Sequence, residues 1–497
     1  MPRITPFVTL RFLIFILFIG IVSVSPSLKI IPSSLIVTSF HDCQRLAELQ
    51  LISLVLLHSI AFTRRETHFC INNTMRYAFY VLIILAITSS CLAKPPRHAL
   101  IEISLFAGLS YLALFVAHLY RENSALLIKR ITYVCWAGVF LCMASFYAGY
   151  ITASIFKTPV SWPAPLTGFS NIRFFNQYQL WSLGLITLPL LAFEIKSINV
   201  RRCLNISLAF WWALMFFSAS RGALLAWIFG IVLTAITYRK LAWPFIRMQL
   251  AHITAGFFIY VILFKIIPSL REFSVNTGTV MRDTTNDRLE LWSLSLNLIQ
   301  DHPIFGVGPM HFAWNHPTSA HPHNSILQLM AEWGLPAALI IFAMAAYSLV
   351  CWLKRFKPQN LQTKPQRDIY LAIVLFFTLT SNGAYSLVDG VIVMPISQVM
   401  MFTFIGLMIG YYNDGKLAEP ATQNQGLVAR VSNRYDGLKS DLRSNGLSRF
   451  KPVFAGIVLV ALVWSTLPEI LQSAAGSEKH FSMGYTSTGP RFWLEVK

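Results

Sequence analysis

The chain has 497 residues, of which 55% are hydrophobic and only 12% are charged, and its mean hydropathy is +0.57. A soluble domain carries about 25% charged residues, so this composition excludes an ordinary soluble protein and indicates repeated transmembrane helices. The net charge of +19 is better explained by Lys and Arg in cytoplasmic loops than by nucleic-acid binding. The cysteines show no CxxC pair and no regular spacing, so they define neither a redox compartment nor a metal site.

Apolar runs of the length of a membrane span recur along the chain. The first, "FVTLRFLIFILFIGIVSVS", could be a signal peptide, but it lacks a clear small-x-small cleavage site, so we interpret it as a retained first helix. In chain order the predicted spans are 7–24, 45–62, 77–93, 98–118, 131–153, 178–195, 203–220, 222–237, 250–267, 326–352, 369–388, 392–412 and 453–468. We therefore predict an all-α integral membrane protein with about 12–13 transmembrane helices.

Two polar stretches divide the predicted spans into groups. Residues 1–267 contain about nine transmembrane helices, and 268–325 form a large loop that carries the candidate catalytic motifs. Residues 326–412 hold about three further helices. Residues 413–452 form a basic linker, before the last helix and a short tail at 453–497. The linker is rich in Gly, Ser and Asn, which predicts a flexible segment whose basic residues face anionic lipid.

Charge asymmetry predicts the orientation of the chain. With a cytoplasmic N-terminus, the cytoplasmic loops contain more than half of the 40 Lys and Arg residues, as the positive-inside rule requires. The loops 157–177 and 268–325 then lie outside the cytoplasm, which in a Gram-negative cell is the periplasm. We expect a multi-pass protein of the bacterial inner membrane.

Four histidines gather at the end of the large loop: His311, His316, His321 and His323. The next residues match a capping box in which Ser325 caps a helix and Gln328 reaches back, so the helix should begin at Asn324 or Ser325. The positive end of this helix favours a neutral imidazole at His323, which can act as a general base. One alternative is that His323 is a loop histidine with no functional role. Another is that the four histidines form a zinc site, although no Cys or Glu completes a familiar zinc spacing.

A polar stripe follows on the same helix. Asn324, Gln328 and Glu332 recur every four residues, and at membrane depth such a stripe must face protein or water. Glu332 has two interpretations, a functional carboxylate or a buried hydrogen-bonding group that locks helices together. Gly334 and Pro336 predict a bend in the helix just below it.

Three arginines on the same side complete the candidate site. Arg221 lies in "FSASRGALLAW" between two predicted spans, Arg288 lies in "NDRLELWSL", and Arg173 lies in "GFSNIRFFNQYQLWSL". A long basic side chain at a span end can simply reach toward the headgroups, whereas a guanidinium can also bind a diphosphate bidentately. Three outward arginines beside a neutral histidine predict an anion site with a base.

Several of these motifs resemble those of the O-antigen ligase family, which includes O-antigen polymerases and bacterial O-oligosaccharyltransferases. The stretch "SRGALL" at 220–225 resembles the family's Ser-Arg-x-x-x-Leu, and 288–312 resembles its run of Arg, Trp, Pro and Gly-x-Gly. The "HN" at 323–324, followed by Gly334, resembles its His-Asn-x9-Gly-x-x-Gly. Ala337 stands where that motif has its last glycine, and another small residue should pack similarly.

The resemblance implies a helical membrane enzyme with a periplasmic active site and a glycan on undecaprenyl diphosphate as donor. Transfer in this family needs no metal and no other cofactor. By motif, Arg221 and Arg288 would hold the diphosphate, and His323 would deprotonate or orient the acceptor hydroxyl, so these three are the catalytic candidates. The substrate-binding candidates that we add are Arg173, His321, Asn324, Gln328 and Glu332.

The leading functional prediction is transfer of O-antigen to lipid A-core in lipopolysaccharide biosynthesis. A protein O-oligosaccharyltransferase, which "SNIRFFNQYQ" also resembles, and an O-antigen polymerase are alternatives with the same chemistry. A polysaccharide flippase is more distant, because transporters place ionisable groups near the membrane midplane, often with paired repeats, whereas the titratable residues here cluster at one face. The expected partners are the lipid-linked donor, a lipid A-core or protein acceptor and membrane lipids, with no nucleic acid.

Overall fold

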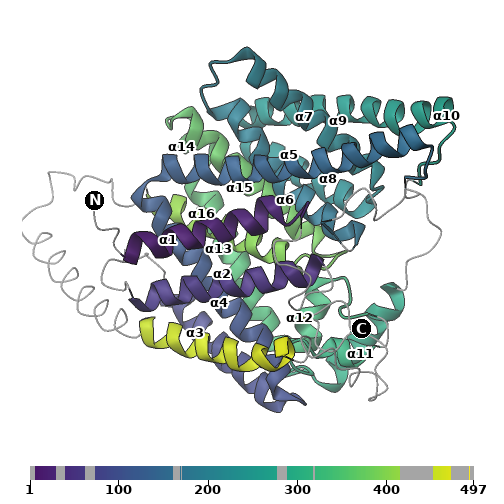
Figure 1. Ribbon diagram of the computed structural model, residues 1–497. Coiled ribbons are helices and arrows are strands. Elements are labelled where there is room, and N and C mark those ends of the chain that lie inside the picture. The colour runs from purple at the N-terminus through teal and green to yellow at the C-terminus, as the bar shows by residue number, and fades with distance from the viewer. Residues whose placement is uncertain are drawn as a thin grey trace, which may run out of the picture.

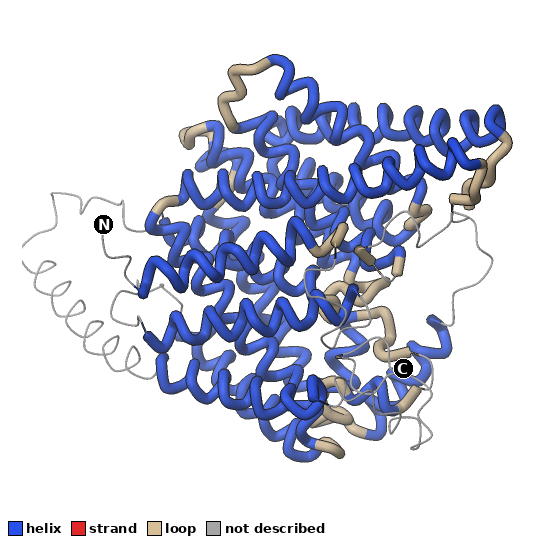
Figure 2. The backbone as a smooth tube through the Cα atoms, viewed as in Figure 1, coloured by secondary structure: helices blue, strands red, loops and turns tan. Residues whose placement is uncertain are grey.

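Helices that run side by side form the body of the protein (Figures 1 and 2). The structure, a computed structural model, describes residues 6–28, 40–61, 73–160, 168–169, 171–276, 288–316, 319–414, 451–471 and 492. These residues contain no strand, and their β structure is limited to an isolated bridge between Val160 and Val275. Among them, 8 helical segments are long and apolar enough to cross a membrane. The prediction of an all-α integral membrane protein is confirmed.

Each predicted span overlaps a helix of the structure, and the span predicted at 326–352 is divided between two helices. The helices are α1 (Pro6–Ile19), α2 (Phe40–Ala61), α3 (Asn73–Leu92), α4 (Pro96–Glu122), α5 (Ser124–Phe156), α6 (Ile172–Ala192), α7 (Ile198–Phe217), α8 (Arg221–Tyr238), α9 (Trp243–Val261), α10 (Ile267–Arg271), α11 (Arg288–Asp301), α12 (Ser325–Trp333), α13 (Leu335–Arg355), α14 (Pro358–Leu361), α15 (Gln366–Tyr385) and α16 (Pro395–Asp414). A final helix covers Lys451–Leu471. The predicted linker at 413–452 lies almost entirely outside the described residues.

Helix α6 lies at the centre of the bundle and is buried along most of its length. Its Trp181 donates from Nε1 to Ser397 Oγ of α16 at 2.8 Å, and Trp211 of α7 donates to Ser182 Oγ of α6 at 3.1 Å. The indole rings therefore fill the core while their N–H groups remain hydrogen-bonded. This packing fixes the middle of α6 relative to α7 and α16.

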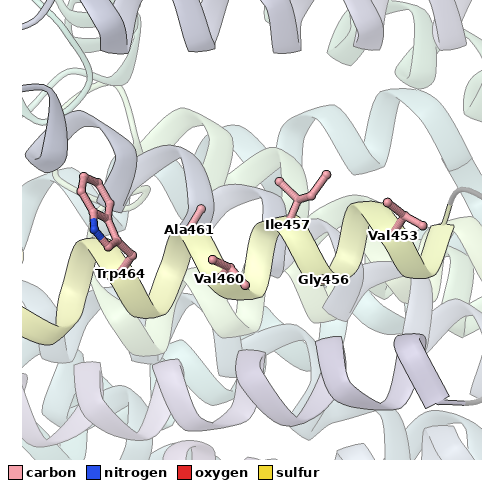
Figure 3. A pocket seen from close by; sticks show the side chains of 6 residues that line it. All are labelled: Val453, Gly456, Ile457, Val460, Ala461 and Trp464. Carbon is pink, nitrogen blue, oxygen red and sulfur yellow. The ribbon is translucent and has the colours of Figure 1, made fainter.

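Apolar side chains cover the outside of the bundle, as a lipid environment requires. On the final helix, one exposed face forms a shallow apolar groove (Figure 3). The residues that line it are Val453, Gly456, Ile457, Val460, Ala461 and Trp464. The groove contains no titratable side chain, so it suits contact with hydrocarbon rather than chemistry.

The chain breaks between α12 and α13 at Gly334, which has a φ of +82°. A Cβ at this position would lie 2.1 Å from the carbonyl oxygen of Ile304, so only glycine fits. The freed backbone groups pair with the loop after α11: Val307 N–H donates to Ala331 O at 2.9 Å, and Leu335 N–H donates to the carbonyl of residue 303 at 2.8 Å. The predicted bend is confirmed, and the loop after α11 packs against the backbone at this bend.

Gly334→Ala should destabilise the protein, because its Cβ would collide with the Ile304 backbone and its φ is strained for alanine. We expect the free energy of unfolding to fall by about 1–3 kcal/mol. Thermal unfolding of the detergent-solubilised protein measures this change.

The matched control for this change is Gly383→Ala on α15, where an added Cβ meets nothing within 4 Å. Alanine favours helix over glycine, so the control should be neutral or slightly stabilising. Equal melting temperatures for the two variants would contradict the close contact between Gly334 and the Ile304 backbone.

Candidate active site

Four helices begin at the same end of the bundle, and each brings a polar side chain to one site. Arg173 is the second residue of α6, Arg221 opens α8 and Arg288 opens α11, while His323 lies just before the N-cap of α12. Figure 1 shows α11 and α12 together at this end. Helix N-termini carry partial positive charge and N–H groups that have no partner within the helix. The arrangement therefore favours an anionic ligand.

His323 lies between a cation and an anion. Its Nε2 atom is 3.2 Å from Nη1 of Arg173, and its Nδ1 atom is 3.7 Å from Oδ1 of Asp389. A guanidinium can only donate hydrogen bonds, so Nε2 accepts, and the proton of a neutral ring lies on Nδ1, facing the carboxylate. The side chain is 16% exposed, which leaves the ring open to a ligand.

Asp389, in the connection between α15 and α16, is the anion of this site and was missed in the sequence analysis. Its side chain is 3% exposed, and it accepts a hydrogen bond from Gly390 N–H at 2.7 Å. Burial by itself raises the pKa of Asp389, but interactions with His323, the Tyr385 hydroxyl and the Gly390 N–H together hold the pKa below its usual value. Asp389 is therefore ionised. The signal in the sequence was a carboxylate in the few residues between two predicted spans.

The pKa of Arg288 reflects the excess of positive charge at the site. Burial, followed by the nearby charge of Arg173, lowers the pKa of Arg288; Arg221 acts in the same direction, and Asp389 opposes them. The Nε atom of Arg288 is buried and has no hydrogen-bond partner among the described residues. A ligand with several negative oxygens would relieve the repulsion and satisfy this donor.

The start of α8 ties Arg221 to the same site. Ala219 has a φ of +50°, and Ser220 caps the helix, its Oγ accepting an N–H of the first turn at 3.3 Å. The Ser220 Oγ also lies 3.5 Å from the hydroxyl of Tyr385, which in turn interacts with Asp389. The start of the helix that carries Arg221 is thus linked to Asp389 through one buried tyrosine.

Asn324, not Ser325, caps α12. Its Oδ1 accepts from two backbone N–H groups of the first turn, at 3.0 and 3.1 Å. Gln328 donates to Glu332 at 3.3 Å instead of reaching back to the cap. The predicted capping box is therefore wrong, because the Asn324 amide already satisfies the end of the helix. The predicted start of the helix at Ser325 is confirmed.

Glu332 is completely buried and faces the loop that follows α11. It accepts the N–H of Phe312 at 3.0 Å and the side-chain amide of Gln328 at 3.3 Å. The polar stripe of α12 thus faces protein, and these contacts favour the interpretation of Glu332 as a group that holds the loop.

The clustered histidines separate in the structure. His321 and His323 lie together at the site, with ring centroids 4.2 Å apart. His311 stacks on Trp314, and His316 Nε2 lies 4.0 Å from the carboxylate of Glu290. In the part of the chain that the structure describes, no three His, Cys, Asp or Glu side chains gather closely enough to hold a metal ion.

Residues 206–342 match the family model described as O-Antigen ligase. The match runs from α7 into α13 and contains Arg221, Arg288 and His323, whereas Arg173 and Asp389 lie outside it. No curated protein matches the chain. The match supports the family recognised from the motifs, and that family implies a glycan-transferring enzyme.

Glu332→Gln should leave the protein close to wild type, because glutamine keeps an oxygen that can accept the Phe312 N–H. Glu332→Ala should lower the free energy of unfolding by about 1–3 kcal/mol, since buried donors then lose their acceptor. Thermal unfolding of the two variants beside wild type measures the difference. An equal loss of stability in both variants would show that the charge of Glu332, and not its hydrogen bonds, stabilises the fold.

Proposed function

We propose that this chain, a member of the O-antigen ligase family through its domain at residues 206–342, transfers a glycan from undecaprenyl diphosphate to an acceptor hydroxyl. The reaction would take place at the periplasmic face of the inner membrane, and the acceptor that we favour is lipid A-core. The observation that carries the proposal is the meeting of three arginines with the His323–Asp389 pair at one end of a membrane bundle. There the polyprenyl tail can stay in the bilayer while the diphosphate and sugar lie outside it.

The arginines are suited to the donor. Transfer breaks the bond between the anomeric carbon and a phosphate oxygen, and negative charge develops on the departing diphosphate. Fixed cations stabilise such charge most where water is excluded. Arg288 has a buried Nε without a partner, and the charges of Arg173 and Arg221 act on it, so a diphosphate would satisfy the donor and relieve the repulsion.

His323 is suited to activate the acceptor. Its Nε2 lone pair faces Arg173 in the resting structure. When the diphosphate attracts Arg173, Nε2 becomes free to take the proton of the acceptor hydroxyl as the oxygen attacks the anomeric carbon. Asp389, facing Nδ1, would stabilise the imidazolium that forms. Donor binding would in this way prepare the base.

His323→Ala should lower glycan transfer by about 10²- to 10⁴-fold, the usual contribution of a general base. The measurement is transfer from undecaprenyl-diphosphate glycan to lipid A-core in proteoliposomes, with membrane abundance checked first. His302→Ala is the matched control, because this histidine is exposed at the end of α11.

The same assay discriminates the alternatives. A protein acceptor or a growing glycan that is modified in place of lipid A-core would identify an O-oligosaccharyltransferase or a polymerase. Lipid crossing without transfer would mark a flippase and overturn the proposal. If His323→Ala lowered the transfer rate only a few-fold, His323 would be a positioning residue and not the general base.

Arg221→Lys tests bidentate binding of the diphosphate. Lysine keeps the charge but lacks the planar fork, so this variant should be nearly as impaired as Arg221→Ala. A side chain that only reaches toward headgroups would tolerate lysine. The measurement is transfer rate against donor concentration.

Arg271→Lys, on the exposed end of α10, is the matched control. Arg288→Lys serves as the comparison within the site. Full activity of Arg221→Lys would refute a bidentate contact at that position and leave Arg288 as the main diphosphate ligand.

A further inference from the structure

The backbone of His323 adopts a conformation that histidine rarely takes. Its φ is +53°, in the left-handed region, where residues other than glycine are uncommon. Such a conformation is strained, so the surrounding structure must supply compensating contacts. This conformation turns the chain into the N-cap Asn324 and points the imidazole at Asp389.

The contact that compensates is made by His321. Its Nδ1 atom accepts a hydrogen bond from the backbone N–H of His323 at 3.2 Å. An imidazole nitrogen that accepts a backbone N–H carries no proton, so the proton of His321 lies on Nε2. Burial, followed by the nearby charge of His323, lowers the pKa of His321 well below its usual value, which keeps this Nδ1 lone pair available.

The ring of His321 has little freedom to move. It is buried, and a Cβ added to Gly390 would lie 2.4 Å from its Cε1 atom and 2.7 Å from its Nε2 atom. Ser319 Oγ donates to the carbonyl of His321 at 2.8 Å, and Trp292 Nε1 donates to the carbonyl of Pro322 at 3.1 Å. Both faces of the His321–His323 turn are therefore fixed, one by the large loop and the other by the segment that carries Asp389.

We propose that His321 is a positioning residue that holds His323 in its left-handed conformation through the Nδ1 hydrogen bond, rather than a ligand of the substrate. The proposal rests on the proposed function in taking His323 as the base. Gly390 also contributes to this arrangement, because its lack of a side chain lets the segment that carries Asp389 pack against the His321 ring. Base and carboxylate are thus brought together by a histidine that touches neither reactant.

The two ring nitrogens can be separated by substitution. Asparagine places a side-chain acceptor near the position of Nδ1, whereas glutamine places its amide near the position of Nε2. His321→Ala and His321→Gln should lower the maximal transfer rate by about tenfold, the equivalent of one lost hydrogen bond, with the KM for the lipid-diphosphate donor unchanged. His321→Asn should restore the rate to within about threefold of wild type.

A second readout does not depend on transfer. The rate at which diethyl pyrocarbonate modifies His323, followed by mass spectrometry, reports how firmly its ring is held. We expect faster modification in His321→Ala and His321→Gln and a wild-type rate in His321→Asn. Equal rates in all variants would overturn the positioning role, as would a raised acceptor KM with an unchanged maximal rate.

Gly390→Ala provides an independent test of the fixed ring. The added methyl should displace the His321 ring and lower the transfer rate. Asparagine has no atoms at the Cε1 and Nε2 positions, so adding Gly390→Ala to His321→Asn should cost less activity than Gly390→Ala costs in the wild-type protein; the loss that remains reflects the contact of the new Cβ with Val393 Cγ2 at 2.9 Å. An equal loss in the two backgrounds would refute the contact with the His321 ring. If wild-type protein transfers no glycan while His323 modification still follows the expected order, the proposed function fails and the positioning role stands.

Discussion

Repulsion between guanidinium groups beside one buried carboxylate is the condition around which the site is built. Burying a cation is costly unless neighbouring groups compensate, yet two further arginines act on Arg288 and are opposed by Asp389 and Tyr385. Each arginine belongs to the first turn of a helix, so the packing of the bundle holds these charges where they are. The protein fold, rather than mutual attraction, keeps the cations together and ready for an anion.

Close backbone contacts hold α11, and with it Arg288, in place. The loop after α11 docks on the break between α12 and α13, where Gly334 admits the carbonyl of Ile304 and Glu332 accepts the N–H of Phe312. Arg288 lies at the far end of α11, and its helix is anchored to the same short segment that presents His323. The positions of Arg288 and His323 therefore depend on the same contact between the loop and α12.

Much of this could be predicted from the sequence, because polar residues at the ends of apolar runs are conspicuous. The spans, Arg221, Arg288 and the helix that starts after His323 were found in this way. Asp389 was not, since its partner His323 is far away along the chain and nothing in the sequence shows that the two meet. The cap of α12 was misassigned because Asn324 and Ser325 are both good capping residues, and only the geometry of the turn decides between them.

The order of these residues along the chain has a consequence for biosynthesis. The arginines and His323 leave the ribosome before Asp389, which follows α15. A nascent chain that already contains all of residues 206–342 therefore has its cations and its imidazole but no carboxylate to face Nδ1. Insertion of α15 and α16 supplies that carboxylate, so a chain truncated after the family domain would lack the anion that faces His323 even if every earlier helix were in place.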